Sequence, residues 1–343
     1  MRLSHYYLAF LGLILFIFFG VSCSTKELPQ EASLADTWTN PKDGMTLVFI
    51  PAGEFEMGSS NEEIDFALAK CNDYVHIAHP GEEDCPRELF EMQQPVHKVY
   101  LDSYWIDRTE VTNAMFAKFI EETGYKTDAE KLGQSWIFSI ELERGEEVKG
   151  ADWQHPHGPS TSIEGLNAHP VVQVSWNDAA AYCTWAGRRL PTEAEWEKTA
   201  RWDPQTGQAY RYPWGNAPVA GDLLNYSDRN LNIVYTDMTQ DDGYQYTAPV
   251  GSYPMGASPY GALDMAGNVF EWVQDYFDDG YYSISSYENP QGPTNGIYRV
   301  LRGGSWQGDS RVTRSADRSQ FPHPSRAMNW AGFRCALSPI TTE

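Results

Sequence analysis

Basic residues are scarce in this chain. Its 343 residues include 25 Lys and Arg against 47 Asp and Glu, which gives a formal net charge of −22. Proteins that bind nucleic acid neutralise phosphates with clustered Lys and Arg, so this charge balance excludes that class of partner. Disorder is excluded as well, because 41% of the residues are hydrophobic and only 21% are charged. The chain is therefore a folded, acidic protein.

A hydrophobic run long enough to cross a bilayer comfortably is also lacking. The apolar stretch over residues 8–19 has the length of a signal-peptide core. The small residues after it and Cys23 resemble the lipobox of bacterial lipoproteins, in which the signal is removed before a cysteine that then carries lipid. We expect residues 1–22 to be a lipoprotein signal peptide and 23–43 a flexible tether. The alternative is an ordinary secretory signal with an incidental cysteine.

Cysteines are few, and the number that can form disulfides depends on whether Cys23 is lipidated. If Cys23 is lipidated, an even number remains, in an exported protein that meets oxidising conditions. Four cysteines allow three pairings, and spacing alone does not choose among them. The remaining cysteines are Cys71, Cys85, Cys183 and Cys335.

No internal repeat and no Pro- or Ser-rich linker follows residue 40, so we expect one domain over residues 44–338. Short apolar runs predict strands at 47–50, 99–101 and 104–106. Helices are predicted after Thr112, Ser175 and Thr192, whose side chains can cap them. The chain after residue 203 is turn-rich. These patterns predict a single α+β domain of mostly irregular backbone, held by aromatic residues, disulfides or metal ions.

A series of motifs runs along the chain in a recognisable order. They are VFIPAGEF at 48–55, WIDRTEVT at 105–112, HPV at 169–171, RLPTEAEWE at 189–197, PWG at 213–215, MAGNVFEW at 265–272, RGGSW at 302–306 and GFRC at 332–335. Together they resemble the formylglycine-generating enzyme (sulfatase-modifying factor) family. The resemblance implies a C-type-lectin-like α+β fold with little regular secondary structure. It also implies the pair Cys183–Cys335, which leaves Cys71 to pair with Cys85.

Calcium is a further implication of the resemblance, with up to two ions. The residues offer carboxylates and backbone carbonyls, which are the hard oxygen ligands that calcium prefers. The alternative is that Asp242 begins a plain turn and that Glu271 is a solvated carboxylate. The first expected site comprises Asn225, Tyr226, Asp242 and Tyr244, and the second comprises Asp264, Gly267, Val269 and Glu271.

Catalytic members of the family oxidise a substrate cysteine to formylglycine with O2 and a Cu(I) held by two thiols. Counting from the RGGSW motif, the positions of those thiols fall on Gly308 and Thr313, and no cysteine occurs from Gly303 to Arg334. We therefore expect no copper and assign no catalytic residue. His155 and the nearby His157 form the only close histidine pair, and we interpret it as part of a surface loop.

In the family, the segment that matches residues 305–330 lines the substrate-peptide groove, and here it also carries Phe321 and Arg326. An Arg- and aromatic-rich groove suits an extended peptide, a glycan or an anionic group. The alternative is that some of these arginines pair with core carboxylates. The groove candidates are Arg302, Ser305, Trp306, Arg311, Arg314, Arg318 and Trp330.

Three functions remain open at this point. The leading one is an exported, membrane-anchored lipoprotein of the cell envelope, in the outer membrane or at the cell surface. It would be non-catalytic and act as a calcium-stabilised binding or assembly module, with a peptide, glycan or cell-envelope protein as ligand. The second is a formylglycine-generating oxidase for sulfatase maturation, or a divergent oxidoreductase. The third is a hypervariable ligand binder, although the segment before GFRC is not enriched in Asn, Tyr and Ser.

Overall fold

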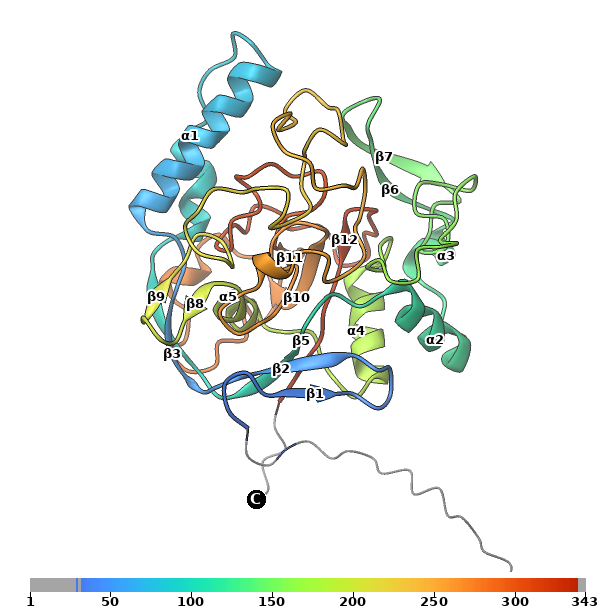
Figure 1. The fold of residues 1–343 in the computed structure, drawn as a ribbon, viewed down its shortest axis with the longest axis horizontal. Helices are drawn as coiled ribbons and strands as arrows, with labels where there is room; N and C mark the ends of the chain where they lie inside the picture. The colour runs from blue at the N-terminus through green and yellow to red at the C-terminus, as the bar shows by residue number, and fades with distance from the viewer. Residues whose placement is uncertain (1–28, 30–31, 339–343) are drawn as a thin grey trace, which may run out of the picture.

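Two small sheets, three hairpins and a few short helices carry the fold in the computed structural model, which describes residue 29 and residues 32–338 (Figure 1). Long irregular segments connect these elements, so the α+β, loop-rich prediction is confirmed. Among the described residues, no helix is long and apolar enough to span a bilayer. The expected signal peptide and Cys23 lie outside the described residues.

The larger sheet brings the two ends of the described chain together. Its strand order is β1 (Thr37–Thr39), β2 (Thr46–Ile50), β5 (Tyr104–Asp107) and β13 (Ala336–Leu337), and all neighbours are antiparallel. The predicted strands at 47–50 and 104–106 are thus confirmed.

The expected tether is wrong at its C-terminal end. Strand β1 pairs with β2 in the register Thr37 to Val48, and Asn40 is buried, with its side-chain amide donating to the Ala186 carbonyl at 2.9 Å. A segment with these backbone and side-chain bonds belongs to the domain. The domain therefore begins before residue 44.

The second sheet lies at the centre of the molecule. Strand β10 (Phe270–Tyr276) pairs antiparallel with β11 (Arg299–Arg302) and parallel with β12 (Ala331–Gly332). The side chain of Trp272 belongs to one hydrophobic core, and that of Val273 belongs to the other. Because both faces of β10 are buried, its sequence lacks the polar alternation of a half-exposed strand, and the turn-rich interpretation missed it.

Three hairpins complete the strands, and the predicted strand at 99–101 is confirmed as part of one of them. The hairpins are β3 (Gly53–Met57) with β4 (His97–Leu101), β6 (Gln134–Ser139) with β7 (Arg144–Lys149), and β8 (Trp202–Asp203) with β9 (Gln208–Ala209).

The three predicted helices are present with their predicted caps. They are α2 (Asn113–Thr123), α4 (Trp176–Trp185) and α5 (Glu193–Arg201). At α5, the Glu195 amide donates to Thr192 Oγ1 at 3.1 Å, and the Thr192 amide donates to Glu195 Oε2 at 2.8 Å. Two unpaired donors at the helix start are satisfied in this way.

Other helical segments were not predicted. The longest is α1 (Asn61–Ala78), which projects from the body at the upper left of Figure 1 and carries Cys71 on its buried face. The others are α3 (Asp128–Leu132) and the 3-10 turns η1 (Arg87–Gln93), η2 (Pro254–Gly256) and η3 (Tyr281–Ser283).

Candidate functional site

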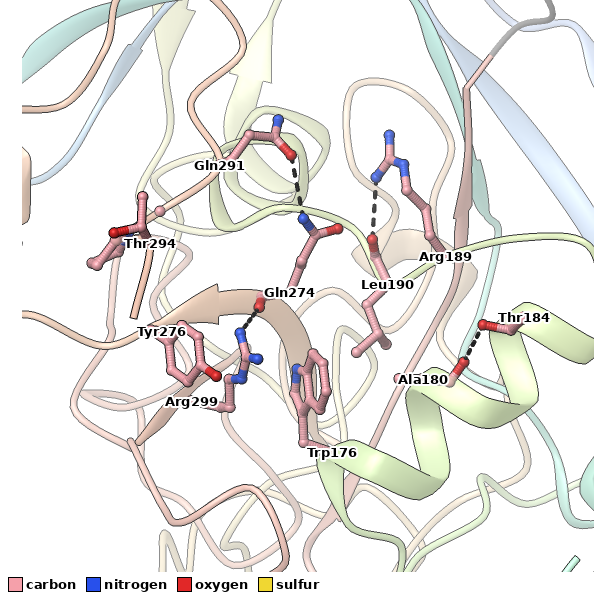
Figure 2. A pocket seen from close by; sticks show the side chains of 12 residues that line it. Trp176, Ala180, Thr184, Arg189, Leu190, Gln274, Tyr276, Gln291, Thr294 and Arg299 are labelled. Carbon is pink, nitrogen blue, oxygen red and sulfur yellow. Dashed lines mark hydrogen bonds between the residues drawn. The ribbon is translucent and has the colours of Figure 1, made fainter. Parts of the chain in front are cut away.

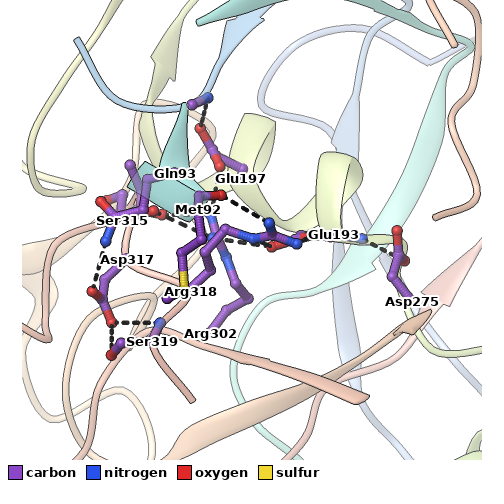
Figure 3. A network of polar contacts seen from close by, with 12 residues as sticks. Met92, Gln93, Glu193, Glu197, Asp275, Arg302, Ser315, Asp317, Arg318 and Ser319 are labelled. Carbon is purple, nitrogen blue, oxygen red and sulfur yellow. Dashed lines mark hydrogen bonds and ion pairs between the residues drawn. The ribbon is translucent and has the colours of Figure 1, made fainter. Parts of the chain in front are cut away.

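Three of the arginines expected in a surface groove lie in the interior. Arg302, Arg314 and Arg318 are each at most 1% exposed. Arg302 Nη2 lies 2.5 Å from Glu197 Oε2, and Arg318 donates to both oxygens of Glu193, at 2.9 and 3.0 Å (Figure 3). Guanidinium groups removed from water this completely need carboxylate partners. The expectation of a basic surface groove is therefore wrong for these three, and the alternative of core ion pairs holds.

The turn η1 covers this network from outside. The Gln93 side chain is fully buried, accepts from Arg314 at 3.2 Å and donates to Asp317 at 3.2 Å. The carbonyl of Met92 accepts from Arg318 Nη1 at 2.9 Å. The turn thus supplies partners to Arg314 and Arg318, which were expected to face a ligand. The sequence analysis missed this segment.

An open cleft remains beside the network. Its volume is about 500 Å³, and the side chains that line it include Trp136, Phe138, Phe321, Arg326, Met328 and Trp330. The Arg326 guanidinium lies over the Trp136 ring, with its carbon 3.7 Å from the ring centroid. Trp330 lines this cleft, together with Phe321 and Arg326 of the same expected groove segment. Ser305 and Trp306 are buried, and Arg311 is half-buried away from it.

The two expected thiol positions lie in packed surroundings. A Cβ atom added at Gly308 would stand 2.6 Å from Val312 Cγ2. Thr313 is fully buried, and its Oγ1 has no hydrogen-bond partner among the described residues. Arg311, between them, places Nη1 3.1 Å from Cys71 Sγ on α1. No thiol faces this region, because every cysteine of the described chain is in a disulfide.

Both expected disulfides are confirmed. Cys183 on α4 bonds Cys335 with 5.7 Å between the Cα atoms, and Cys71 bonds Cys85 with 6.0 Å between them. The first joins residues 152 positions apart and connects a core helix to the C-terminal strand. The second closes the loop after α1.

The four residues of the first expected calcium site come together. Asp242 Oδ2 accepts from the Tyr226 amide at 2.9 Å, and Oδ1 accepts from the Tyr244 amide at 2.8 Å. Burial raises the pKa of the Asp242 carboxyl to about 7. Asn225 is 1% exposed, and its Oδ1 has no partner among the described residues. A buried carboxylate is thus bonded to the residue that follows Asn225, whose side-chain oxygen is unpaired among the described residues.

The second expected site is arranged differently. Glu271 accepts from Arg334 at both oxygens, at 2.6 Å each, and from Trp196 at 2.8 Å. Its carboxylate is buried and paired, so the solvated alternative is wrong. Glu110, which the sequence analysis missed, is fully buried, and its Oε2 has no partner among the described residues. Burial first, and then the charge of Asp264, raises the pKa of Glu110.

Gly267 connects the two regions through a close backbone approach. Its φ is +77°, and an added Cβ would stand 2.1 Å from the Asn225 carbonyl oxygen. Only glycine fits at such a contact. Val269, two residues on, is fully buried. Among the described residues, no three His, Cys, Asp or Glu side chains gather closely enough to hold a metal by themselves. The expected calcium sites rely on backbone carbonyls for half of their ligands.

The histidine pair does not converge on one point. His155 Nδ1 lies 3.1 Å from Asp152 Oδ1, whereas His157 Nδ1 lies 3.0 Å from Asn329 Nδ2. His155 is half-buried, with its side chain 40% exposed, so the surface-loop interpretation fits it in part and does not fit His157. His157 lines a cavity of about 370 Å³, and burial lowers its pKa to about 4.

Comparison with known proteins identifies the family. Residues 33–339 match the sulfatase-modifying factor enzyme 1-like domain. The chain belongs to the sulfatase-modifying factor family. It is 36% identical to the formylglycine-generating enzyme of Mus musculus over 345 residues, covering 94% of this chain and 84% of the relative. It is 38% identical to that of Streptomyces coelicolor over 326 residues, covering 90% and 94%.

Two solved structures share the fold of this family member. PvdO from Pseudomonas aeruginosa superposes with a TM-score of 0.64 at 24% identity, covering 90% of this chain and 100% of that chain. Treponema denticola variable protein 1 superposes with a TM-score of 0.58 at 21% identity, covering 89% and 99%. At these identities the likeness concerns the fold alone.

The metals that the family implies fit this chain unequally. Cu(I) prefers thiolates, and the described residues offer none: Gly308 and Thr313 carry no sulfur, and Cys335 is bonded to Cys183. The copper site of catalytic family members therefore does not fit here. Calcium fits better, because Asn225 and Glu110 each hold a buried oxygen without a partner.

Proposed function

We propose that this chain is an exported, lipid-anchored and non-catalytic member of the sulfatase-modifying factor family that binds an extended peptide. One observation carries the proposal. The positions that would hold the copper thiols carry Gly308 and Thr313, while an aromatic cleft of about 500 Å³ stays open nearby. Without the thiols, the protein could still bind a peptide in the cleft but could not hold the copper ion that oxidises a peptide cysteine.

The cleft supports a peptide as the ligand. Trp136 lines the cleft as a half-buried ring with Arg326 over it, and the largely buried Trp330 contributes to the cleft wall. Aromatic and Arg side chains of this kind dominate the binding energy of peptide and protein interfaces. The groove is also where the family resemblance places a substrate peptide. In this proposal the peptide belongs to another protein of the cell envelope.

Calcium has a structural role in this proposal. The long segment between α5 and β10 contains little regular secondary structure. The first expected site lies in it, as do Asp264, Gly267 and Val269 of the second, while Glu271 lies in β10. One ion would be held at Asn225 and Asp242, and the other at Asp264 and Glu110. An ion at each place would satisfy oxygens that lack partners and would fix the turns that carry them. It would act as a structural support.

The alternative function is formylglycine-generating oxidation. It is favoured by the 36–38% identity to formylglycine-generating enzymes over nine-tenths or more of this chain. The missing thiols oppose it. A high overall sequence identity does not replace the two cysteines that bind copper.

Panning of a random peptide display library on the purified chain tests the binding proposal. Enriched peptides should bind Trp136→Ala about tenfold more weakly than the parent, because stacking on the indole is lost. The matched control is Arg108→Gln, a change at an exposed arginine outside the cleft, which should bind as the parent does. Enrichment of nothing, or equal affinity for Trp136→Ala, would refute the proposal. Binding of neutral glycans on an array and of no peptide would also count against it.

Lipid anchoring is tested separately in cells. The parent should fractionate with membranes and carry a lipid mass on Cys23, whereas Cys23→Ala should be released or retained as an unprocessed precursor. A parent protein that is soluble and unmodified would contradict the anchoring.

A further inference from the structure

Another cavity lies apart from the peptide cleft and from the cavity beside His157, and it shares no lining residue with either. Its volume is about 430 Å³, within the range of small-molecule sites. Helix α4 forms one wall, strands β10 and β11 form the floor, and the loop at 291–294 forms the other wall (Figure 2). Neither the family comparison nor the proposed peptide binding involves this cavity.

Arg299 provides the uncompensated positive charge among the residues that line the cavity. Its guanidinium carbon lies 3.8 Å from the centroid of the Trp176 ring and 3.4 Å from that of Tyr276, so the group is held between two aromatic faces. One Nη donates to the carbonyl of Gln274 (Figure 2). The Nε atom is buried and has no partner among the described residues. A planar group clamped in this way keeps a fixed direction for its N–H donors.

No carboxylate of the described residues lies within ion-pair distance of Arg299. Asp275 of the neighbouring strand β10 accepts from the Glu193 amide at 2.8 Å and forms no ion pair with Arg299. The fully buried arginines behave differently, because Arg302, Arg318 and others each contact a carboxylate. Arg211 and Arg326 are also half-buried without an ion pair among the described residues, but each lies over a single aromatic ring, whereas Arg299 is held between two rings at the wall of a cavity.

The other groups of the cavity are polar but neutral, or already neutralised. Arg189 contacts both oxygens of Glu195 at 2.6 Å, so its charge is compensated. The side-chain amides of Gln274 and Gln291 bond each other at 3.2 Å, and Thr184 adds a hydroxyl. These groups can exchange hydrogen bonds with several ligand hydroxyls. Leu190 and Trp176 give the cavity an apolar side.

From this arrangement we infer that the cavity is a binding site for a sugar carboxylate, with the carboxylate on Arg299 and the hydroxyls on the paired amides. A carboxylate matches the planar fork of a guanidinium and would supply the anion that this arginine lacks. The absence of a second uncompensated charge in the cavity disfavours a zwitterionic amino acid. The ligand is either a free sugar acid or one unit of an acidic polysaccharide.

Ligand-observed NMR titration of the full folded chain tests the inference. The probes are glucuronate, an oligosaccharide that contains glucuronate, and glucose as the neutral match. Glucuronate, free or in the oligosaccharide, should bind about tenfold or more tightly than glucose, because only it forms charge-assisted hydrogen bonds. Tighter binding of the free acid identifies a small ligand, and binding of the oligosaccharide alone identifies a polysaccharide.

Variants assign the binding to this cavity. Arg299→Gln should lower the affinity for glucuronate about tenfold and leave the weak binding of glucose unchanged. Gln291→Ala changes only an exposed loop side chain, so it should fold normally and weaken both sugars. Arg108→Gln, on a distant exposed arginine, should change neither. No binding by any probe, equal binding of glucuronate and glucose, or an Arg299→Gln variant that binds as the parent does would overturn the inference.

Discussion

Arg302 and Glu197 form an ion pair in the centre of the molecule, with Nη2 2.5 Å from Oε2 and neither side chain exposed. Removing the charge of Glu197 leaves Arg302 with the longer contact to Glu193 Oε1, at 3.3 Å, and so leaves a buried charge less well compensated. We expect Glu197→Gln to lower the free energy of unfolding by about 3 kcal/mol or more, measured by urea denaturation. The amide oxygen can still accept from the Gly58 amide, as Glu197 Oε1 does at 2.8 Å, but the NH2 group cannot accept from Arg302, so the change removes both the charge and the acceptor.

An exposed pair provides the control for that result. Lys42 and Glu122 lie 2.5 Å apart, with side chains 41% and 38% exposed. Lys42→Gln should cost less than about 1 kcal/mol, because water screens the pair. Equal losses for the two variants would contradict the claim that the groove arginines are structural.

The buried network also shows where sequence reasoning stops. Local signals sufficed for the capped helices, since Thr192 and Glu195 lie three residues apart. They could not place Arg302, because its partner Glu197 is 105 positions away and the same side chain suits a surface groove. Helix α1 carried a signal that was overlooked: Ile64, Ala67 and Cys71 are buried at helical spacing. Glu110 lies in one of the motifs, but its sequence position gives no sign that its side chain is near Asp264 in the fold.

The long-range disulfide should stabilise the chain more than the local one. Cys183–Cys335 spans 152 positions and Cys71–Cys85 spans 14, and the entropy lost by the unfolded chain grows with loop length. Replacing the first pair by alanine should lower the free energy of unfolding by about 5 kcal/mol, and replacing the second by about 3 kcal/mol. Chemical denaturation of both double variants measures this difference. A larger loss from the local pair would contradict the ranking.

Asp275 should make the stability of the chain depend on pH. Burial, followed by the charges of Glu193 and Glu195, raises its pKa to about 8, although Arg318 opposes the shift. Between about pH 4 and about pH 8 the folded state then binds more protons than the unfolded state, so the free energy of unfolding falls as pH rises. Asp275→Asn cannot ionise and should flatten this decline.

Urea denaturation at about pH 5 and about pH 8 measures the effect. The matched control is Asp279→Asn, at an exposed acid four residues further on, which should keep the slope of the parent. A parent whose stability rises with pH over this window, or an Asp275→Asn variant with an unchanged slope, would contradict the assignment.

Removal of calcium should destabilise the chain. With EDTA the melting temperature should fall by about 5 °C or more, because an ion that binds only the folded state stabilises it by mass action. Asn225→Ala removes an unpaired oxygen of the first site and should reduce the response to EDTA. Asp84→Asn, at an exposed acid on the loop after α1, should respond as the parent does. An unchanged melting temperature with EDTA would rule out both ions.

The central claim is that this family member does not oxidise cysteine, and one assay tests it most directly. The purified chain is incubated with a Cys-x-Pro-x-Arg peptide, Cu(I) and O2, and the peptide is analysed by mass spectrometry. The formylglycine-generating enzyme of Streptomyces coelicolor serves as the positive control. Because Gly308 and Thr313 provide no thiolate, we expect the peptide to be recovered unchanged. Conversion of its cysteine to formylglycine above the level without protein would contradict the account.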